Sequence, residues 1–205
     1  MKVLLINGSP HKEGNTNIAL EEVAKALNAD GVETEIYWIG VHPIPGCIAC
    51  YKCYQTGVCV FNTGAYADLY EKIQHADGYV IGSPVYYAGP AGSLCALLDR
   101  LFYSAGRFMA YKPAAAVSVC RRGGSVASFD RLNKYFTINN MPIVSSQYWN
   151  VVYGRDQGEA LQDAEGLQTM RTLGHNMAWL LKAIHIADAP AHPAPEPRIP
   201  TNFIR

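Results

Sequence analysis

Short aliphatic runs alternate with amphipathic segments along most of this chain. Residues 3–6 are Val-Leu-Leu-Ile and carry no charge, which is typical of a strand covered on both faces. The leucines of residues 94–101 instead recur at helical spacing. By these criteria the expected strands are residues 2–6, 33–39, 78–82, 114–119 and 142–144, and the expected helices begin near residue 15 and cover residues 66–75, 94–102, 125–136 and 167–184.

This alternation predicts one α/β domain, built as a doubly wound parallel sheet with helices on both faces. Ligands on such sheets bind at the carboxyl ends of the strands, near the point where the strand order reverses. Three unusual loops follow predicted strands, at residues 8–17, 82–89 and 120–125. We therefore expect one ligand site where these loops meet.

The first of these loops has the features of a phosphate site. It lies between a buried strand and a helix start, so that free backbone N–H groups and the positive end of the helix dipole face an anion. The hydroxyls of Ser9 and Thr16 add donors, and Asn15 or Thr16 is the expected N-cap of the helix. The loop has neither the spacing of a nucleoside-triphosphate loop nor that of a dinucleotide fold. The alternative is an ordinary strand–helix turn rich in capping residues.

Composition narrows the classes of partner. The chain has 205 residues, with 17 Lys plus Arg against 17 Asp plus Glu, so its formal net charge is zero. This balance argues against nucleic acid or an anionic membrane as the main partner. No apolar run approaches the roughly 18 residues that span a bilayer, and the first residues lack the pattern of a signal peptide. We expect a cytoplasmic protein with reduced cysteines.

Four cysteines form a C-x2-C-x2-C-x5-C run inside a long loop at residues 41–63. In a reducing compartment this density indicates a metal, a cluster or thiol chemistry. Successive x2 gaps are typical of bacterial ferredoxins, whereas zinc favours two separated pairs. Thiol redox chemistry and vestigial cysteines remain alternatives. Cys95 and Cys120 are interpreted as small buried residues.

The first loop, Gly-Ser-Pro-His-Lys-Glu-Gly-Asn-Thr-Asn, resembles the FMN phosphate loop of the flavodoxin-like NADPH-dependent FMN reductase family. The Ser-Pro-Val-Tyr segment after the third strand resembles the family's segment along the flavin ring, and the Arg-Arg-Gly-Gly segment resembles its third, glycine-rich loop. His11 stands where the family more often has Arg. The resemblance implies that FMN contacts Ser9, His11, Gly14, Asn15, Thr16 and Asn17 through its phosphate, and Pro84, Val85, Tyr86, Tyr87, Arg121, Arg122, Gly123 and Gly124 through its ring.

The cysteine spacing is similar to that of the iron–sulfur flavoprotein branch of this family. That resemblance implies a [4Fe–4S] cluster held by Cys47, Cys50, Cys53 and Cys59. It also implies a flavodoxin-like five-stranded sheet in the order 2-1-3-4-5. We expect residues 1–187 to form this domain, with the cysteine-rich insert at 41–63 and a proline-rich tail at 188–205. A homodimer or homotetramer is expected, with the apolar Phe203 and Ile204 of the tail against a neighbouring subunit.

The expected function is that of an FMN-dependent oxidoreductase. A reduced nicotinamide or ferredoxin is the expected donor, and a quinone, azo compound, flavin or small oxidant the acceptor. No catalytic side chain is named, because hydride transfer to flavin N5 needs no protein acid or base. Two alternatives are a non-enzymatic electron carrier, against which the zero net charge argues, and a cysteine-rich metal or redox sensor on the same scaffold.

Overall fold

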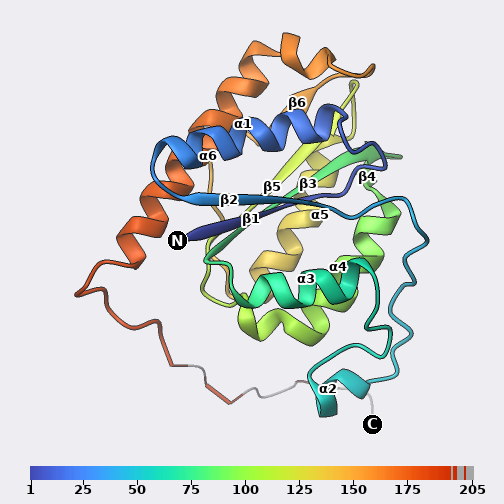
Figure 1. Ribbon diagram of the computed structural model, residues 1–205, viewed down its shortest axis with the longest axis vertical. Helices are drawn as coiled ribbons and strands as arrows, with labels where there is room; N and C mark the ends of the chain where they lie inside the picture. The colour runs from blue at the N-terminus through green and yellow to red at the C-terminus, as the bar shows by residue number, and fades with distance from the viewer. Residues whose placement is uncertain (195, 198–200, 202–205) are drawn as a thin grey trace.

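The computed structural model describes residues 1–194, 196–197 and 201, and its strands and helices alternate as predicted (Figure 1). The strands are β1 (Lys2–Asn7), β2 (Glu33–Trp38), β3 (Gly78–Tyr86), β4 (Gly89–Pro90), β5 (Ala114–Cys120) and β6 (Val151–Tyr153). The helices are α1 (Asn15–Ala29), α2 (Lys52–Thr56), α3 (Ala65–Gln74), α4 (Gly92–Ala105), α5 (Ser125–Ile138) and α6 (Ala164–Ile184), with short 3₁₀ turns η1 (Gly106–Phe108) and η2 (Glu159–Gln162). In the described part of the chain, no helix is both long and apolar enough to cross a membrane.

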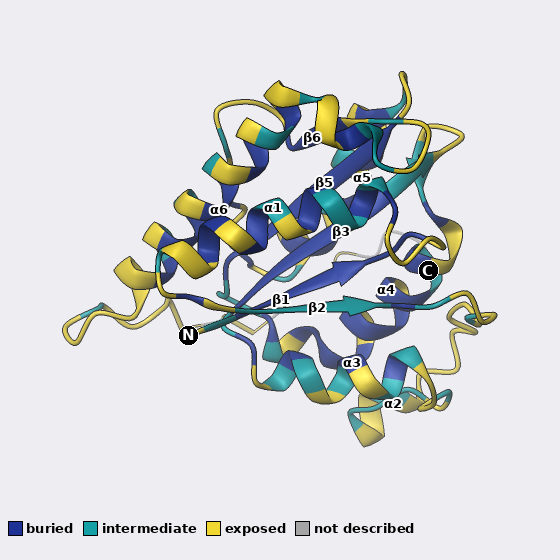
Figure 2. Ribbon diagram, turned by 45° about the horizontal axis from the view of Figure 1, so that its top comes forward, coloured by how far each residue is buried: buried dark blue, intermediate teal, exposed yellow. Residues whose placement is uncertain are grey.

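Five strands form a parallel sheet in the order β2-β1-β3-β5-β6. The short strand β4 pairs antiparallel with the end of β3. This confirms the predicted doubly wound sheet and its order. Nearly all residues of β1 and β5 are buried, as the dark blue strands of Figure 2 show. Burial on both faces explains why these segments read as continuous runs of apolar and small residues.

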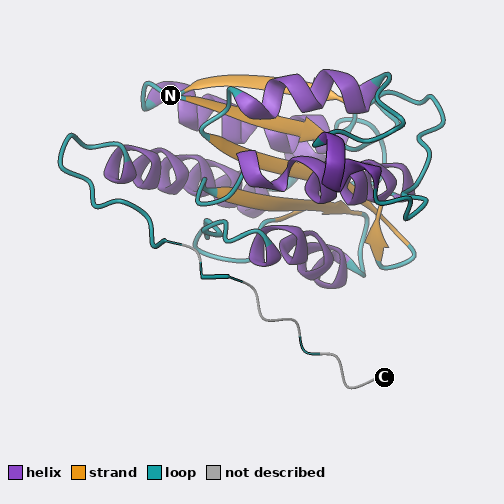
Figure 3. Ribbon diagram, turned by 90° about the horizontal axis from the view of Figure 1, so that it is seen from below, coloured by secondary structure: helices purple, strands orange, loops and turns teal. Residues whose placement is uncertain are grey.

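Helices cover both faces of the sheet, which gives the expected three layers (Figures 1 and 3). Successive side chains of a strand point to opposite faces. Thus Val3 and Leu5 pack with the core under α1 and α6, whereas Leu4 and Ile6 pack with the core under α3, α4 and α5. The helix α6 lies close against α1 because Gly174 has no side chain: a Cβ there would stand 2.6 Å from that of Ala26.

The fifth strand is not where the sequence analysis placed it. Of residues 142–144, only Ile143 forms an isolated bridge, to Ala114, whereas β6 pairs with the far half of β5. The buried Asn150 lies between the two segments: its Nδ2 donates to the Ala116 carbonyl at 3.1 Å, and its own carbonyl accepts from Ser118 N–H at 2.9 Å. A side-chain amide therefore replaces part of the strand ladder along β5.

The third strand is longer than predicted. It continues through residues 83–86 into a tight hairpin with β4, so part of the expected 82–89 loop is strand. The two turn residues, Tyr87 and Ala88, have φ values of 50° and 59°. Glycine or asparagine usually occupies such a turn, because L side chains are strained there. The hairpin tip is thus a strained and exposed feature at the carboxyl edge of the sheet.

After α6 the described residues of the tail form neither helix nor strand, as its proline content predicts. His192 stacks on Tyr111 with ring centroids 4.2 Å apart, so this stretch of the tail returns to the surface of the domain. Phe203 and Ile204, which we expected to lie against a neighbouring subunit, are outside the described residues.

Candidate functional site

A cleft of about 740 Å³ opens at the carboxyl ends of β1, β3, β5 and β6. Doubly wound sheets bind their ligands at this edge, and small-molecule sites usually measure about 300–1,000 Å³. The predicted site residues that line the cleft are Ser9, His11, Gly14, Asn15, Thr16, Pro84, Val85, Tyr86 and Arg121. Residues from all three predicted loops therefore meet at one cleft.

The loop after β1 is held in shape by Asn7, the last residue of that strand. Asn7 is fully buried, and its Oδ1 accepts the Ser9 N–H at 3.0 Å. Its Nδ2 donates to the Lys12 carbonyl at 3.2 Å and to Asn17 Oδ1 at 3.4 Å. One side chain thus joins the start, middle and end of the loop. Sequence reasoning missed Asn7, because it reads as an ordinary strand end.

The helix α1 begins without the side-chain cap that was predicted. Its N-cap is Gly14, and Asn15 and Thr16 are already helical. The Asn15 side chain bonds elsewhere: Nδ2 donates to the Asp156 carbonyl at 2.9 Å, and Oδ1 accepts the Gly158 N–H at 3.1 Å. The first N–H groups of a helix have no intrahelical partner, so those of Asn15 and Thr16 remain available to an anion.

Two hydroxyls stand at this helix start. Thr16 is only 2% exposed and lines the cleft, yet its hydroxyl makes no hydrogen bond to a described residue. Ser9 is also buried and lines the cleft, and its Oγ accepts the His11 N–H at 3.1 Å. That contact fixes the Ser9 oxygen while leaving its own O–H free to donate. The cleft therefore presents two hydroxyl groups that can donate, beside the free N–H groups of α1.

The opposite walls come from the strand ends. Pro84, Val85 and Tyr86 extend from β3, and Cys120 ends β5. Burial raises the pKa of the Cys120 thiol, which keeps it neutral. Trp38, at the end of β2, also lines the cleft and donates its Nε1–H to the Ser9 carbonyl at 2.7 Å. Apolar and aromatic side chains therefore form this part of the lining.

Five predicted residues do not line the cleft. The side chain of Asn17 bonds to Asn7 and Glu21, and Tyr87 projects fully exposed from the hairpin tip. Arg122 and Gly123 are exposed on the loop after β5. Gly124, with φ of 87°, packs against the hairpin: a Cβ there would lie 2.7 Å from the Cα of Ala88. Because Gly124 has no side chain, the loop after β5 can pack closely against the hairpin between β3 and β4.

A fourth segment, which the sequence analysis missed, borders the cleft. It consists of Gly154, Arg155, Asp156 and Gln157, directly after β6. The Glu159 carboxylate accepts the N–H groups of Arg155 at 2.7 Å and Asp156 at 3.0 Å, and these bonds lower the Glu159 pKa. The sequence does carry a signal for this segment, because a turn bounded by glycines follows Val-Val-Tyr. That signal becomes useful only once Val-Val-Tyr is identified as the fifth strand.

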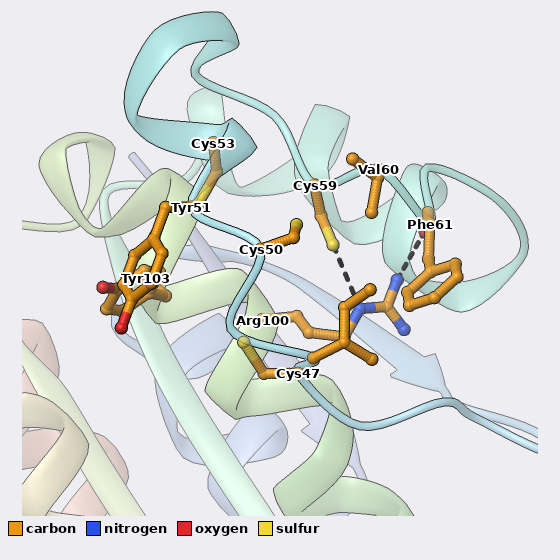
Figure 4. Close-up of a pocket in the computed structure, with 10 residues that line it drawn as sticks. Cys47, Cys50, Tyr51, Cys53, Cys59, Val60, Phe61, Arg100 and Tyr103 are labelled. Carbon is orange, nitrogen blue, oxygen red and sulfur yellow. Dashed lines mark hydrogen bonds between the residues drawn. The ribbon is translucent and has the colours of Figure 1, made fainter.

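The four clustered cysteines line a second, separate cavity of about 20 Å³ on the insert between β2 and α3. Figure 4 shows the side chains of Cys50 and Cys59 turned toward one another, with Cys53 above them on α2 and Cys47 below. Cys47 and Cys50 are exposed, and Cys53 and Cys59 are half-buried. Burial raises the pKa of Cys53, with the neighbouring cysteines adding to the shift. None of the six cysteines is in a disulfide.

The residue types that line this cavity are those of a metal centre, but their positions in this structure are not. Four thiols are the ligand set of an iron–sulfur cluster or a structural zinc. Among the described residues, however, no three His, Cys, Asp or Glu side chains are close enough together to hold a metal ion. The cavity therefore has the ligand types of such a centre without the arrangement of one.

Comparison with known proteins gives consistent matches. The family model for NADPH-dependent FMN reductase matches residues 1–156. An iron–sulfur flavoprotein of Methanocaldococcus jannaschii is 32% identical over 192 residues, covering 90% of this chain and 99% of that protein. An NADPH azoreductase of Bacillus sp. is 29% identical over 185 residues, covering 89% and 92% of the two chains. A solved archaeal flavodoxin shares the fold, with a TM-score of 0.60 at 15% identity over 89% of this chain and 99% of that one.

Proposed function

The chain belongs to the NADPH-dependent FMN reductase family, and from that premise we propose that it is an FMN-dependent oxidoreductase whose cofactor occupies the cleft at the carboxyl edge of the sheet. One observation carries this proposal. Thr16 is only 2% exposed and lines that cleft together with the first free N–H groups of α1, and its hydroxyl has no hydrogen-bond partner among the described residues. Such an arrangement suits a phosphate group.

We assign the phosphate of FMN to the loop between β1 and α1. Ser9 and Thr16 donate through their hydroxyls, and Asn15 and Thr16 donate through their free backbone N–H groups. The N–H groups of Gly14 and Asn17 already donate to the carbonyls of His11 and Gly14, so these two residues shape the loop instead. His11 and Lys12 both line the cleft beside this helix start. The monophosphate of FMN matches a loop that closes on one helix N-terminus, whereas a dinucleotide needs a pyrophosphate site.

We assign the flavin ring to the space between the apolar wall formed by Pro84, Val85 and Tyr86 and the loop that begins at Arg121. Roles for Tyr87, Arg122, Gly123 and Gly124 would require a shift of the hairpin or of the loop after β5 upon binding. When bound, FMN supplies hydride and single-electron chemistry. The protein's part is to bind the ring, orient it and exclude water, so no acid or base is assigned.

The cysteine cavity is proposed to hold a [4Fe–4S] cluster through Cys47, Cys50, Cys53 and Cys59. The four soft donors support it, as does the likeness to an iron–sulfur flavoprotein. With the cluster, ferredoxin is a suitable donor of single electrons. Without it, a reduced nicotinamide is the donor, with a quinone, azo compound or flavin as acceptor, in line with the likeness to an NADPH azoreductase.

Anaerobic purification followed by an absorbance spectrum and mass analysis of the heat-released cofactor tests the proposal. We expect FMN in the released fraction, with broad additional absorbance that dithionite bleaches if the cluster is present. FAD, or no flavin after reconstitution, would refute the FMN assignment.

Rapid-mixing reduction with NADPH, NADH and reduced ferredoxin then identifies the donor, with free FMN as the control for unassisted reduction. Oxidation of the reduced protein by a quinone or an azo dye over many turnovers supports an enzyme. Reduction without turnover of any acceptor indicates an electron carrier instead.

A further inference from the structure

Arg100 is a buried cation on α4 that reaches into the cysteine insert. Its side chain is only 3% exposed within the fold. The Nε–H donates to Cys59 Sγ at 3.4 Å, one terminal N–H donates to the Pro45 carbonyl at 3.0 Å, and the other donates to the Phe61 carbonyl. Figure 4 shows the guanidinium beneath Cys59, on the side of the cavity that faces the protein core.

This cation lacks the counter-charge that a buried arginine normally has. None of the ion pairs among the described residues includes Arg100. The adjacent Asp99 pairs with Arg131 at 3.4 Å and accepts from the Tyr135 hydroxyl instead. Carbonyl oxygens and the rings of Phe61 and Tyr66, 5.6 and 4.7 Å from the guanidinium carbon, provide only partial compensation. A buried charge of this kind is costly unless an anion faces it.

The remaining groups around the guanidinium that can carry negative charge are the sulfurs of the same cavity, Cys59 first among them. We infer that Arg100 is the built-in counter-charge of an anionic, thiolate-ligated centre at the four cysteines, and that it sets the reduction potential of that centre. This rests on the proposed cluster. Arg100 acts here as a positioning and tuning residue: it donates to a ligating sulfur and is not itself a ligand of the centre.

The direction of the tuning follows from charge. Reduction adds one electron and no proton to the centre, so the reduced form is more negative than the oxidised form. A nearby cation and an N–H donated to a ligating sulfur both stabilise the more negative form. Arg100 therefore raises the potential, and its loss should make the centre harder to reduce.

An arginine suits this position better than a lysine. Its planar fork donates in separate directions at once, to a sulfur and to two carbonyls, and it stacks on aromatic faces. Those two carbonyls belong to residues on either side of the cysteine run, Pro45 before it and Phe61 after it. Arg100 thus holds both ends of the insert while directing its charge at the cavity between them.

The test compares R100Q and R100K with R107Q in the full chain, purified anaerobically. Arg107 is the matched control: it donates to the carbonyls of Gly57 and Ser104 on the same side of the domain, but it makes no hydrogen bond to a cysteine. The readouts are iron and sulfide content, flavin content as a check of folding, and an EPR-monitored redox titration of the cluster.

At the potential where the wild-type cluster is half reduced, we expect the oxidised-to-reduced ratio in R100Q to rise about tenfold, which is about 59 mV for a one-electron couple. R100K, which keeps the charge, should shift less, and R107Q not at all. An R100Q protein with full iron content and the wild-type potential would overturn the inference.

If R100Q binds flavin but holds no iron, the iron content of R100K shows whether charge or packing is required. Iron retained in R100K supports the counter-charge, because charge is what that variant restores. Iron absent from both shows that guanidinium packing alone is required, and overturns it. Absence of iron from the wild-type protein itself refutes the proposed cluster, and the inference about Arg100 then fails with its premise, while the FMN assignment is unaffected.

Discussion

The cleft at the carboxyl edge of the sheet and the cysteine insert are organised in opposite ways. The cleft is built on the ends of buried strands and the start of a long helix, and Asn7 holds the loop between β1 and α1 together through three hydrogen bonds. The insert, residues 41–63, contains one helix of five residues, and two of its four cysteines are exposed. A site at strand ends inherits its geometry from the fold, whereas a site on an insert depends on its ligand and on a few anchors such as Arg100.

The two regions also differ in backbone conformation. Within the cysteine run, Ala49 and Tyr51 have φ values of 52° and 57°, a region that costs an L residue roughly 1–2 kcal/mol. In the phosphate loop, by contrast, no residue between Gly8 and Asn17 has a positive φ. We therefore expect the two sites to respond differently to substitution and to cofactor removal.

The largest expected effect comes from the cysteines themselves. Replacing Cys47, Cys50, Cys53 or Cys59 by Ala should abolish or convert the cluster, because a missing thiolate leaves an iron without its protein ligand. Flavin content should stay at the wild-type level, since the cysteine cavity shares no lining residue with the cleft. Iron, sulfide and flavin assays on anaerobically purified protein measure both.

The control for that series is C95A, which alters a half-buried cysteine on α4 outside the cavity. It should keep both iron and flavin. Loss of flavin in the four cysteine variants would break the separation of the two sites, and retention of iron in all of them would show that the cysteines are not its ligands.

Asn7→Ala should have the next largest effect, and on the cleft alone. It removes three hydrogen bonds inside the phosphate loop, each worth about 1 kcal/mol, so we expect a combined loss of about 3 kcal/mol. Part of this loss should appear as weaker FMN binding, of up to about 150-fold, and part as a lower free energy of unfolding of the apoprotein. Flavin titration and urea denaturation separate the two.

Asn28→Ala is the matched control. Asn28 lies near the C-terminal end of α1, away from the cleft, and its side chain accepts a hydrogen bond from the Thr34 hydroxyl. It should leave FMN affinity unchanged. Equal flavin losses in the two variants would mean that the phosphate loop is not organised by Asn7.

Thr16→Val should weaken FMN binding while leaving the fold nearly intact. The substitution keeps the shape of the side chain and removes a hydroxyl that bonds to no described residue. A hydrogen bond to a charged phosphate is worth about 1.5–3 kcal/mol, so the dissociation constant should rise about tenfold to 150-fold. Thr16→Ser, which restores the hydroxyl, should recover most of the affinity. Unchanged binding in Thr16→Val would place the phosphate elsewhere.

The sequence was sufficient for the strand order and for most of the cleft, because both follow from local patterns. Residues 3–6 and 114–119 could only be buried strands, and the loops after them had to share an edge. The fifth strand was misplaced because Pro142, Ile143 and Val144 have the stronger apolar pattern, while pairing along β5 is completed by the side chain of Asn150. Such a side-chain substitute for backbone pairing has no periodic signal.

Arg100 and Asn7 were missed for a related reason. Each acts through hydrogen bonds to backbone groups that are distant in sequence or hidden in a loop, and residue type alone does not reveal those partners. Asp99 pairs with Arg131, whereas its neighbour Arg100 donates to the sulfur of Cys59. That Arg100 is buried and has no acidic partner among the described residues can be seen only in the three-dimensional structure.

The smallest expected effect concerns strain in the cysteine insert. Ala49→Gly should be neutral or stabilise the apoprotein by less than about 1 kcal/mol, because relief of the left-handed backbone offsets the greater freedom that glycine gives the unfolded chain. Ala127→Gly, on the exposed face of α5, should instead destabilise by about 1 kcal/mol, since glycine is a poor helix former. Denaturation midpoints of the two iron-free variants, read against wild type, give the difference. If Ala49→Gly destabilises as much as Ala127→Gly, the insert is not strained at this position, and its contrast with the phosphate loop would rest on exposure and anchoring alone.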